Sequence, residues 1–357
     1  MNKQNTAIIC LSPNKGGMEL DSLKLAIMLS KFTEITLIIK EKHFIHEQCL
    51  NNSDYISLNY KTISFKSTFS PSIIFTVRDI VKKNNIKNVI FLGASELKSL
   101  YFSFLGLDIN LIVRHGTTKS TPKKDWFHKL IYSDVAYHVA ISKHLSKNVK
   151  EIVPFGKKTQ LVTIYPSMSK EISNKEKIYT SELKLLHVGR IAPGKGLKEA
   201  LQACKILYDN KIVFSLNSYG SMFDTYKNEF ESFLQTLSYK NSFNPCGFTN
   251  NIYDEYSKHD IFIFPSKGEG FGNVIMEAIS HGIIVLAFNN TAVTNFKELG
   301  FHIHLVEDAN IKALSKKLLY IAQNLDKEID FAKVNIELAK EVFTQEREQN
   351  QYLQLLE

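Results

Sequence analysis

The stretch LKLLHVGRIAPGKGLKEALQACKIL, residues 183–207, has the pattern of a β-strand, a glycine-containing loop and an amphipathic helix. From Gly189 to Lys195 the spacing G-x-x-x-x-G-K is that of a Walker A phosphate loop. A nucleoside triphosphatase needs a Ser or Thr hydroxyl at the next position to hold magnesium, and this chain has Gly196 there. The loop therefore predicts a phosphate site of another kind at the end of a strand.

Short β-branched runs like the one before this loop recur along the chain and alternate with stretches of helical periodicity, which is typical of parallel α/β units. The first series comprises residues 6–12, 35–40, 88–94, 110–116, 137–142 and 160–165. The second comprises residues 183–189, 213–218, 260–266, 283–288 and 302–306. Both series are apolar on both faces, as buried parallel strands are. We therefore expect an α/β fold of two Rossmann-like, doubly wound parallel sheets facing each other across a cleft.

A length of 357 residues fits two domains, because single cores stop growing at about 250–300 residues. The segment 166–182 is polar and lacks strong periodicity, so we predict a linker there between an N-terminal domain, 1–165, and a C-terminal domain, 183–335. Residues 336–357 are expected to form a helix that packs back on the N-terminal domain.

The composition limits the cellular setting. No run approaches the roughly 20 apolar residues that span a bilayer, and the amino terminus lacks the features of a signal peptide. The four cysteines are far apart with no C-x-x-C pair, which suggests neither a zinc site nor a disulfide framework. A cytoplasmic protein is the expectation.

The charge is unevenly distributed. Residues 1–170 hold 24 of the 44 Lys and Arg residues against 12 of the 36 Asp and Glu residues, a net charge of +12, and the rest of the chain has −4. A basic first half of this kind favours phosphate-bearing partners, whether nucleic acid, anionic lipid or a phosphorylated glycan. An ordinary solvated basic surface is the alternative.

Three features of the first half follow predicted strands. Gly16 and Gly17 precede a helix beginning near Met18, an arrangement that admits a phosphate or sugar or makes a simple tight turn. Arg114 and His115 end a strand, where a histidine is either functional or structural. The segment KKDWFHK, 123–129, contains the single Trp126 and suits a membrane interface, or else an amphipathic helix that buries the tryptophan. No G-x-G-x-x-G occurs, which argues against a dinucleotide cofactor.

The strongest pattern is FPSKGEGFGNVIMEAISHG, residues 264–282, in which Glu269 lies in a glycine-rich loop and Glu277 in a helix that starts near Asn273. Two carboxylates in such a place suit sugar hydroxyls, which donate hydrogen bonds to them. In the loop of the opening stretch, Arg190 and Lys195 are placed to meet a diphosphate, the arginine as a fork and the lysine as a point charge.

Residues 183–290 resemble the donor domain of the retaining glycosyltransferases of family 4, which have the GT-B fold. The shared order is a strand, V-G-R, K-G, and then two Glu residues separated by seven others in an E-G-F-G setting. The first half is similar more loosely, through Gly16 and Gly17, His115, and DVAYHVAISKHL at 134–145. This chain departs from the family pattern in lacking the proline of G-x-P-V and in having LNSYG in place of a G-x-G turn.

The resemblance implies a role for each matching position. Arg190 and Lys195 would hold the diphosphate of a nucleotide-sugar and stabilise it as it leaves. Glu277 would accept the ribose hydroxyls, and Glu269 would hold the donor sugar. The remaining donor positions are the backbone of Gly270, Phe271 and Gly272 at the sugar, Phe248 and Thr249 at the base, Gly16 and Gly17 over the phosphates, and His115 against the sugar.

The function expected on this basis is retaining sugar transfer in bacterial surface polysaccharide or lipopolysaccharide assembly. No metal is expected, because two cations face the diphosphate and no Asp-x-Asp motif occurs; no cofactor is expected beyond the donor, by default a UDP-sugar. The acceptor would be a lipid-linked or lipopolysaccharide-type glycan, with no nucleic acid partner and with peripheral contact at the inner, anionic face of the cytoplasmic membrane. The acceptor or membrane candidates are Arg114, Lys119, Lys123, Lys124 and Trp126.

Two alternatives remain. A nucleotide-sugar epimerase of the same architecture would form product without an acceptor. A phosphate-loop NTPase would use the spacing up to Lys195, but Gly196 and the lack of a strand-ending Asp for magnesium oppose it.

Overall fold

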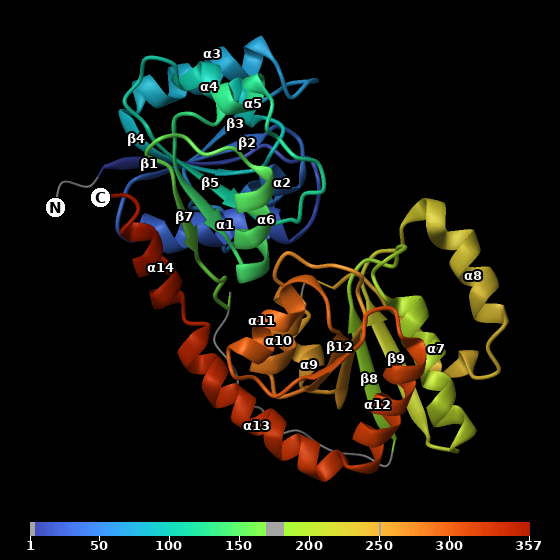
Figure 1. Cartoon of the computed structure of the whole chain (residues 1–357). Coiled ribbons are helices and arrows are strands. Elements are labelled where there is room, and N and C mark those ends of the chain that lie inside the picture. The colour runs from blue at the N-terminus through green and yellow to red at the C-terminus, as the bar shows by residue number, and fades with distance from the viewer. Residues whose placement is uncertain (1–3, 169–181, 250) are drawn as a thin grey trace. The chain divides into compact units, whose positions relative to one another are not determined.

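The chain divides into two units, each built on one parallel sheet (Figure 1). The computed structural model describes residues 4–168, 182–249 and 251–357. The first unit is Met1–Ser169 together with Gln345–Glu357, and the second is Lys170–Thr344. Residues 169–181 of the predicted linker lie outside the described residues.

The sheet of the first unit has seven parallel strands in the order β3-β2-β1-β4-β5-β6-β7. The strands are β1 (Asn5–Cys10), β2 (Ile35–Lys40), β3 (Tyr60–Ile63), β4 (Ile86–Leu92), β5 (Asn110–His115), β6 (Val135–Ala140) and β7 (Gln160–Thr163). The helices are α1 (Gly17–Ser30), α2 (Phe44–Asn51), α3 (Pro71–Lys83), α4 (Leu97–Phe104), α5 (Trp126–Ile131), α6 (Lys143–Ile152) and α14 (Gln345–Leu353).

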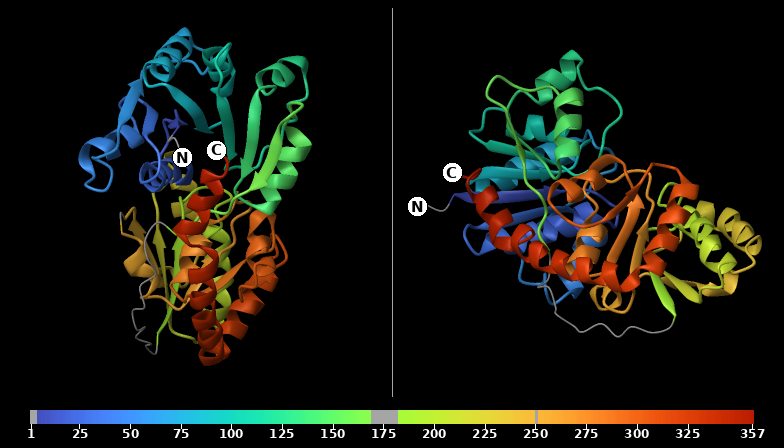
Figure 2. Two further views of the ribbon diagram at one scale, coloured as in Figure 1. Left: turned by 90° about the vertical axis from the view of Figure 1, so that its left-hand side faces the viewer. Right: turned by 60° about the horizontal axis from the view of Figure 1, so that its bottom comes forward.

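Strand β1 is buried on both faces because helices cover both sides of this sheet (Figure 2). Ala7 and Ile9 pack in the core formed with α3, α4, α5 and α6. Ile8 and Cys10, which point the other way, pack in the core formed with α1, α2 and α14. The near-continuous apolar run of the sequence follows directly from this arrangement.

The sheet of the second unit has six parallel strands in the order β10-β9-β8-β11-β12-β13. The strands are β8 (Leu183–Val188), β9 (Phe214–Tyr219), β10 (Phe243–Gly247), β11 (Ile261–Phe264), β12 (Ile284–Phe288) and β13 (His304–Val306). The helices are α7 (Leu197–Asp209), α8 (Lys227–Gln235), α9 (Tyr253–Tyr256), α10 (Asn273–Ser280), α11 (Thr294–Glu298), α12 (Ile311–Gln323) and α13 (Leu325–Val342). Short 3₁₀ turns cover Asp224–Tyr226, Lys240–Ser242 and Thr291–Val293.

Strand β11 is also covered on both faces. Ile261 and Ile263 pack in the core that includes α7 and α12, whereas the ring of Phe262 lies 6.1 Å from that of Tyr256 in α9. The expected α/β fold of two Rossmann-like parallel sheets is confirmed. Of the described residues, no helix combines the length and the apolar character needed to cross a membrane.

Strands β3 and β10 were not expected from the sequence, and both lie at sheet edges. Their residues are largely exposed or half-buried, and β10 contains Pro245, which an edge strand tolerates because it needs no second hydrogen-bonded neighbour. The exposure of these two strands removes the apolar run by which the other strands, including the edge strands β7 and β13, are found.

The end of the chain forms two helices rather than the one expected from residue 336. Helix α13 ends at Val342, and α14 begins at Gln345 and belongs to the first unit, beside α1 (Figure 1). There Glu348, fully buried, accepts hydrogen bonds at Oε2 from Lys24 Nζ at 2.9 Å and from the backbone N–H of Ser167 at 2.8 Å. The backbone carbonyls of Leu356 and Leu355 accept from Asn88 and Asn110.

Candidate functional site

The loop after β8 makes its tightest contact at Gly196, the residue before α7. Its φ is +86°, and a Cβ atom there would lie 2.5 Å from the backbone carbonyl of Pro265. A side chain at this position would therefore need both an unfavourable backbone conformation and a displacement of the segment after β11. The Ser or Thr of a Walker A loop does not fit here, which explains in physical terms why the near-match to that motif breaks at this residue.

The centre of the site is an ion pair between the loops after β8 and β11. Lys195 Nζ lies 2.9 Å from Glu269 Oε1, and the two side chains are 28% and 18% exposed. The hydroxyl of Ser266 donates to the same carboxylate oxygen at 2.7 Å. A cation and a carboxylate, each partly open to solvent, thus lie at the carboxyl ends of neighbouring strands.

Thr291, which follows β12, fixes the backbone of Glu269. Its hydroxyl accepts a hydrogen bond from the Glu269 N–H at 2.9 Å. The φ of Thr291 is +42°, a conformation that costs a β-branched residue on the order of 1–3 kcal/mol. Asn290, beside it, donates to the backbone carbonyl of Ser266 at 2.9 Å, so the loop is held from two successive residues.

His187 fixes the loop after β8 through a hydrogen bond to its backbone. It is buried in β8, with Nε2 3.0 Å from the carbonyl oxygen of Lys195 and Nδ1 3.1 Å from the hydroxyl of Ser218. Burial lowers the pKa of His187 to about 4, so the ring is neutral near pH 7. A neutral ring has one N–H, and a carbonyl only accepts; Nε2 therefore donates to Lys195, and Nδ1 accepts from Ser218.

The second carboxylate lies on α10. Gly272, with a φ of +96°, precedes this helix, which starts at Asn273 as expected. Glu277 Oε2 accepts a hydrogen bond from the hydroxyl of Tyr256 at 2.8 Å. Burial, with the nearby Glu277 carboxylate, raises the pKa of Tyr256 well above 10, so Tyr256 remains a donor and orients Glu277.

The other predicted donor positions differ in what they offer. Arg190 is exposed, as is Phe248 at 54%, whereas Thr249 is half-buried. Gly270 is also half-buried in its loop. The ring of Phe271 is buried, with its centroid 5.0 Å from that of Phe296, so only the backbone of Phe271 is placed to meet a ligand.

In the first unit, Arg114 is not at the surface. It is 2% exposed, its NH2 group lies 2.7 Å from Asp21 Oδ2, and its Nε donates to the hydroxyl of Tyr352 at 3.1 Å. The expectation that Arg114 contacts an acceptor or a membrane is therefore wrong: the guanidinium ties α1 and α14 to β5.

His115 is likewise buried, and both ring nitrogens are engaged within the first unit. Nε2 lies 2.9 Å from His138 Nδ1, and Nδ1 lies 3.1 Å from Lys119 Nζ. Burial and then Lys119 lower the pKa of His115 well below 6.5, and burial together with Lys123 lowers the pKa of Lys119 to about 8. Lys119 thus directs its ammonium inward, to the histidine.

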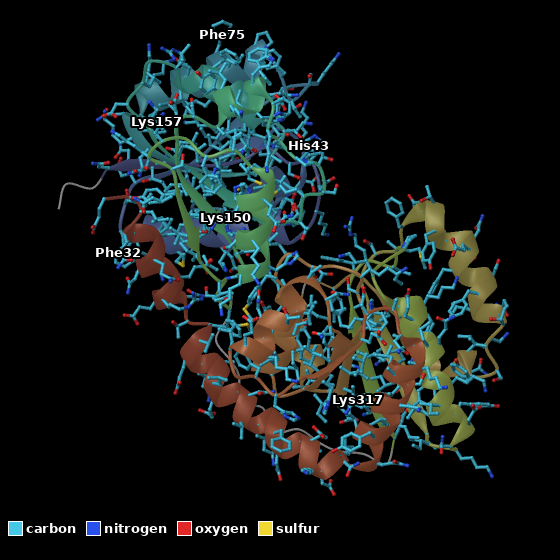
Figure 3. All side chains as sticks on the ribbon, viewed as in Figure 1. Phe32, His43, Phe75, Lys150, Lys157 and Lys317 are labelled. Atoms are coloured by element: carbon cyan, nitrogen blue, oxygen red, sulfur yellow. The ribbon has the colours of Figure 1, made fainter. Side chains whose placement is uncertain are left out.

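Trp126 is 76% exposed at the start of α5, so the alternative in which this helix buries the tryptophan is wrong. Lys124 beside it is exposed and Lys123 is half-buried. Lys150 and Lys157 are further exposed lysines of the same unit (Figure 3). Gly16, in extended conformation, precedes α1, and Gly17 is its first residue, so the two glycines lie at the start of a helix as expected.

Four residues of the site carried no signal in the sequence: His187, Tyr256, Ser266 and Thr291. Their side chains act through partners that the chain brings from other elements, and single Ser, Thr, Tyr and His residues are too common to be singled out. The Lys195 and Glu269 positions, by contrast, lie in unusual glycine patterns.

Comparison with known proteins finds similarity to glycosyltransferases over the region that contains these loops. Residues 168–337 match the model of the glycosyl transferases group 1. The chain is 28% identical over 196 residues to the capsular polysaccharide biosynthesis glycosyltransferase CapM of Staphylococcus aureus, covering 52% of this chain and 50% of CapM. It is 27% identical over 214 residues to CapH of the same organism, covering 57% and 58%. The chain thus spans about half the length of the curated relatives it matches.

Solved structures share the architecture over nearly the whole chain. A glycosyltransferase from Rickettsia africae ESF-5 superposes with a TM-score of 0.83 at 17% identity, covering 99% of this chain and 98% of the other. Anabaena HepE, solved in complex with UDP and glucose, superposes with a TM-score of 0.80 at 14% identity, covering 99% of both chains. These neighbours confirm the GT-B fold.

Proposed function

We propose, on the premise that residues 168–337 form a domain of the glycosyl transferases group 1, that this chain moves a sugar from a UDP-sugar to a glycan acceptor. The product would be part of a bacterial surface polysaccharide, such as a capsule or a lipopolysaccharide. The observation that carries the proposal is the contact of Lys195 with Glu269, which unites a cation suited to phosphate and a carboxylate suited to sugar hydroxyls.

Binding of the donor would break this ion pair and give each of the two residues a new partner. Its diphosphate would take Lys195 and Arg190, and the amino terminus of α10 would add N–H groups directed at the negative charge. Glu269, released from the lysine, would accept hydrogen bonds from the sugar, and Glu277, oriented by Tyr256, would accept from the ribose. Phe248 and Thr249 would line the base, and the backbone of Gly270, Phe271 and Gly272 would face the sugar.

In the transfer step, the bond from the anomeric carbon to the diphosphate breaks and a bond from that carbon to the acceptor oxygen forms on the same face. The departing phosphate takes the proton of the acceptor hydroxyl. Fixed cations stabilise the leaving diphosphate, so neither a metal ion nor a further cofactor is required at this site. His115 is buried with both ring nitrogens engaged within the first unit, so it is not among the donor contacts proposed here.

Two findings on other proteins support this choice of substrates. HepE, which has the same fold, was solved with UDP and glucose, and the relatives CapM and CapH are named for capsular polysaccharide biosynthesis. For the acceptor, the support is the basic charge of residues 1–170 and the exposure of Lys124 and Trp126, which suits an anionic, lipid-linked glycan at a membrane surface. Lys119 directs its ammonium to His115, so of the other two lysine candidates only the half-buried Lys123 would join this surface.

The first experiment measures thermal unfolding with UDP-, GDP-, ADP- and CMP-sugars in the presence of EDTA. A ligand at 100 times its Kd stabilises the bound state by about 2.7 kcal/mol, which raises Tm by several degrees. We expect a UDP-sugar to do so with wild type and with Lys198→Ala, a control at a half-buried lysine three residues away that pairs with Glu229, and not with Lys195→Ala. A shift by ATP with magnesium alone would instead favour the NTPase.

The stereochemistry of the product tests the transfer step, and the need for an acceptor tests the epimerase alternative. With the donor identified, a retained anomeric configuration in the acceptor linkage is expected, and inversion would exclude the proposed step. Turnover of the nucleotide-sugar to an isomer without any acceptor would identify an epimerase. For the membrane contact, we expect binding to anionic liposomes at low salt that Trp126→Ala weakens; no binding by the wild type would remove the lipid surface from the proposal.

A further inference from the structure

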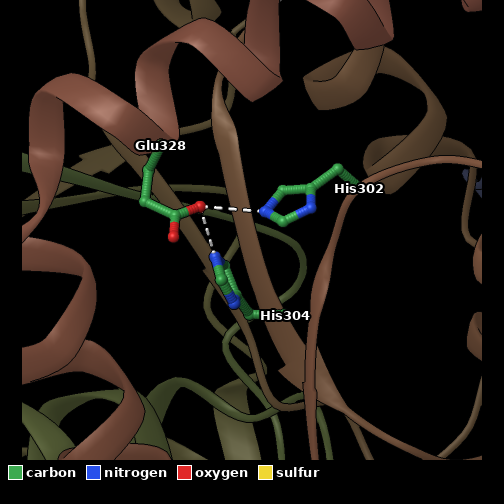
Figure 4. Close-up of side chains that lie close together, drawn as sticks. All are labelled: His302, His304 and Glu328. Carbon is green, nitrogen blue, oxygen red and sulfur yellow. Dashed lines mark hydrogen bonds and ion pairs between the residues drawn. The ribbon is translucent and has the colours of Figure 1, made fainter.

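Three metal-ligating side chains meet in the second unit away from the donor loops (Figure 4). Glu328 Oε2 lies 2.9 Å from His302 Nε2 and 2.7 Å from His304 Nε2. All three candidate ligand atoms lie within 4.8 Å of one another. His304 is the first residue of β13, and Glu328 is in the first turns of α13, so the cluster joins a strand to a helix.

The backbone and packing around the cluster fix its geometry. His304 begins β13 and His302 lies two residues before it, and the Nε2 atoms of both reach Glu328 Oε2. Asn335, seven residues after Glu328 on α13, accepts from the backbone N–H of His302 and donates to its carbonyl, both at 2.8 Å. The ring of His302 stacks on Phe331, with centroids 4.2 Å apart. His302 is thus held against one face of α13 by contacts that do not involve its Nε2 atom.

The ionisation of the cluster suits a cation. Burial lowers the pKa of His304 below 6.5, which keeps the ring neutral near pH 7. Burial alone would raise the pKa of Glu328, but hydrogen bonds from His302 and His304 lower it below its ordinary value, so the side chain is a carboxylate. The Glu328 carboxylate is 2% exposed and its nearest polar partners are two imidazole nitrogens, so a bound cation would neutralise a buried negative charge.

We propose that His302, His304 and Glu328 form a Zn²⁺ site. Two imidazole nitrogens and one carboxylate oxygen are ligands that Zn²⁺ accepts in a tetrahedron, with water in the fourth position. His302 is 39% exposed on its side chain, which gives the ion a route from solvent. Ligand atoms of a tetrahedral zinc site are about 3.3 Å apart, from bond lengths of about 2.0–2.1 Å, so the three side chains need to separate by a few tenths of an ångström.

Binding would require a change of tautomer in each ring. Each Nε2 faces the acceptor Glu328 and therefore carries a hydrogen directed at it; a metal ion bound at Nε2 takes the place of that hydrogen, and the ring then carries its hydrogen at Nδ1. The ion would join β13 to α13, at the amino end of β13, whereas the donor loops follow the carboxyl ends of β8 and β11. The site is therefore separate from the loops proposed to carry out sugar transfer.

The test uses the full chain with any affinity tag removed, because histidine tags bind Zn²⁺ themselves. The protein is treated with a chelator and returned to metal-free buffer, and Zn²⁺ or Mg²⁺ is then titrated by calorimetry and in thermal unfolding. We expect one Zn²⁺ per chain, a rise in Tm of about 5 °C or more at about 100 times Kd, and no effect of Mg²⁺, which prefers oxygen ligands.

The variants assign the ion to the cluster. His304→Ala and His302→Gln should each weaken Zn²⁺ binding by about 100-fold or more, since loss of a direct ligand exceeds the 10–100-fold cost of losing an outer partner. His302→Gln keeps a polar side chain at a partly exposed position and tests the site should His304→Ala fail to fold. His43→Ala, a histidine of the first unit, is the control and should bind as wild type does. Co²⁺ substitution adds a direct readout, because its visible absorption reports nitrogen ligands in the wild type that the two cluster variants lack.

Absence of Zn²⁺ binding by the wild type would overturn the proposal. So would a binding constant that His43→Ala lowers while His302→Gln and His304→Ala leave it unchanged, because the ion would then lie in the first unit.

Discussion

Lys195 Nζ lies 2.9 Å from Glu269 Oε1, so the two groups assigned to different parts of a nucleotide-sugar pair with each other in the chain alone. The pair is partly exposed, and the same carboxylate oxygen also accepts from Ser266, which would hold Glu269 in place when Lys195 turns to a phosphate. In the proposed function, this ion pair would couple the positions of the sugar and the diphosphate.

Glu269→Gln should separate the sugar from the nucleotide in binding. The amide keeps the size of the side chain but replaces one carboxylate acceptor, and hydrogen bonds to charged groups contribute about 1.5–3 kcal/mol. We expect the affinity for the donor found in the thermal screen to fall about 10- to 100-fold, while UDP binds at least as well as before because Lys195 has lost its competing partner. Calorimetric titration with both ligands checks this; an equal loss for UDP and UDP-sugar would contradict the assignment of Glu269 to the sugar.

Gly196→Ala should destabilise the second unit more than Gly194→Ala does. Both glycines have a positive φ, +86° and +79°, but a Cβ atom at Gly196 meets Pro265 at 2.5 Å, whereas at Gly194 the nearest atom is in the flexible side chain of Lys267 at 3.9 Å. Gly194→Ala should cost about 1 kcal/mol of backbone strain, and Gly196→Ala that cost plus the displacement of the loop after β11. The free energies of unfolding in denaturant compare the two; equal losses would mean that the close approach has no energetic weight.

Gly196→Ser also tests the link to the Walker motif directly. It recreates the G-x-x-x-x-G-K-S sequence, yet we expect no magnesium-dependent ATP hydrolysis, because the side chain would enter the space of the Pro265 carbonyl rather than reach a metal. Measurable ATPase activity absent from the wild type would show that the loop can open into a true phosphate loop.

Tyr256→Phe should weaken donor binding through Glu277. The substitution removes the hydroxyl that donates to Glu277 Oε2 at 2.8 Å and leaves the packing of the ring unchanged. A loss of about 10-fold in affinity is expected for UDP and for UDP-sugar alike, since the ribose is common to both. Tyr320→Phe, at an exposed tyrosine of α12, is the control. If the affinity for UDP stayed at the wild-type value, Tyr256 would not act as a positioning residue for Glu277, the carboxylate proposed to bind the ribose.

The sequence located much of this site but not its contacts. The glycine patterns point to Lys195 and Glu269, yet these residues are 74 positions apart, and their pairing depends on β8 and β11 being neighbours in the sheet. Arg114 was misassigned for the same reason, because its partner Tyr352 comes from the last helix, 238 positions later. Helix α5 has six residues, too few for a periodic pattern to decide whether Trp126 is buried or exposed.

Stability should depend on pH through His187, whose pKa is lowered by burial from 6.5 to about 4. Between these values the unfolded chain binds the proton and the folded chain does not, so the free energy of unfolding rises with pH by up to about 1.4 kcal/mol per unit. Above 6.5 this group adds no dependence, and its stabilising contribution is lost as the pH falls towards 4.

His138 and His115 also have lowered pKa values, so the comparison that isolates His187 is wild type against His187→Gln. Glutamine keeps polar contact with Ser218 and the Lys195 carbonyl and does not titrate. Denaturant unfolding at pH 7 and pH 5 should show a smaller loss on acidification in the variant than in the wild type. Identical losses would mean that the folded state accommodates the imidazolium.

The return of α14 to the first unit has a consequence for the order in which the chain folds on the ribosome. Three buried polar side chains of the first unit have hydrogen-bond partners that are synthesised only after the entire second unit. The pairs are Lys24 with Glu348, Arg114 with Tyr352, and Asn88 with the carbonyl of Leu356. The second unit, contiguous from Lys170 to Thr344, can close its core as it emerges, whereas the first keeps buried polar groups without those partners until the last turns of α14 appear. The part made first is thus the part completed last, and it depends on chaperones or on its own solubility for the whole interval between.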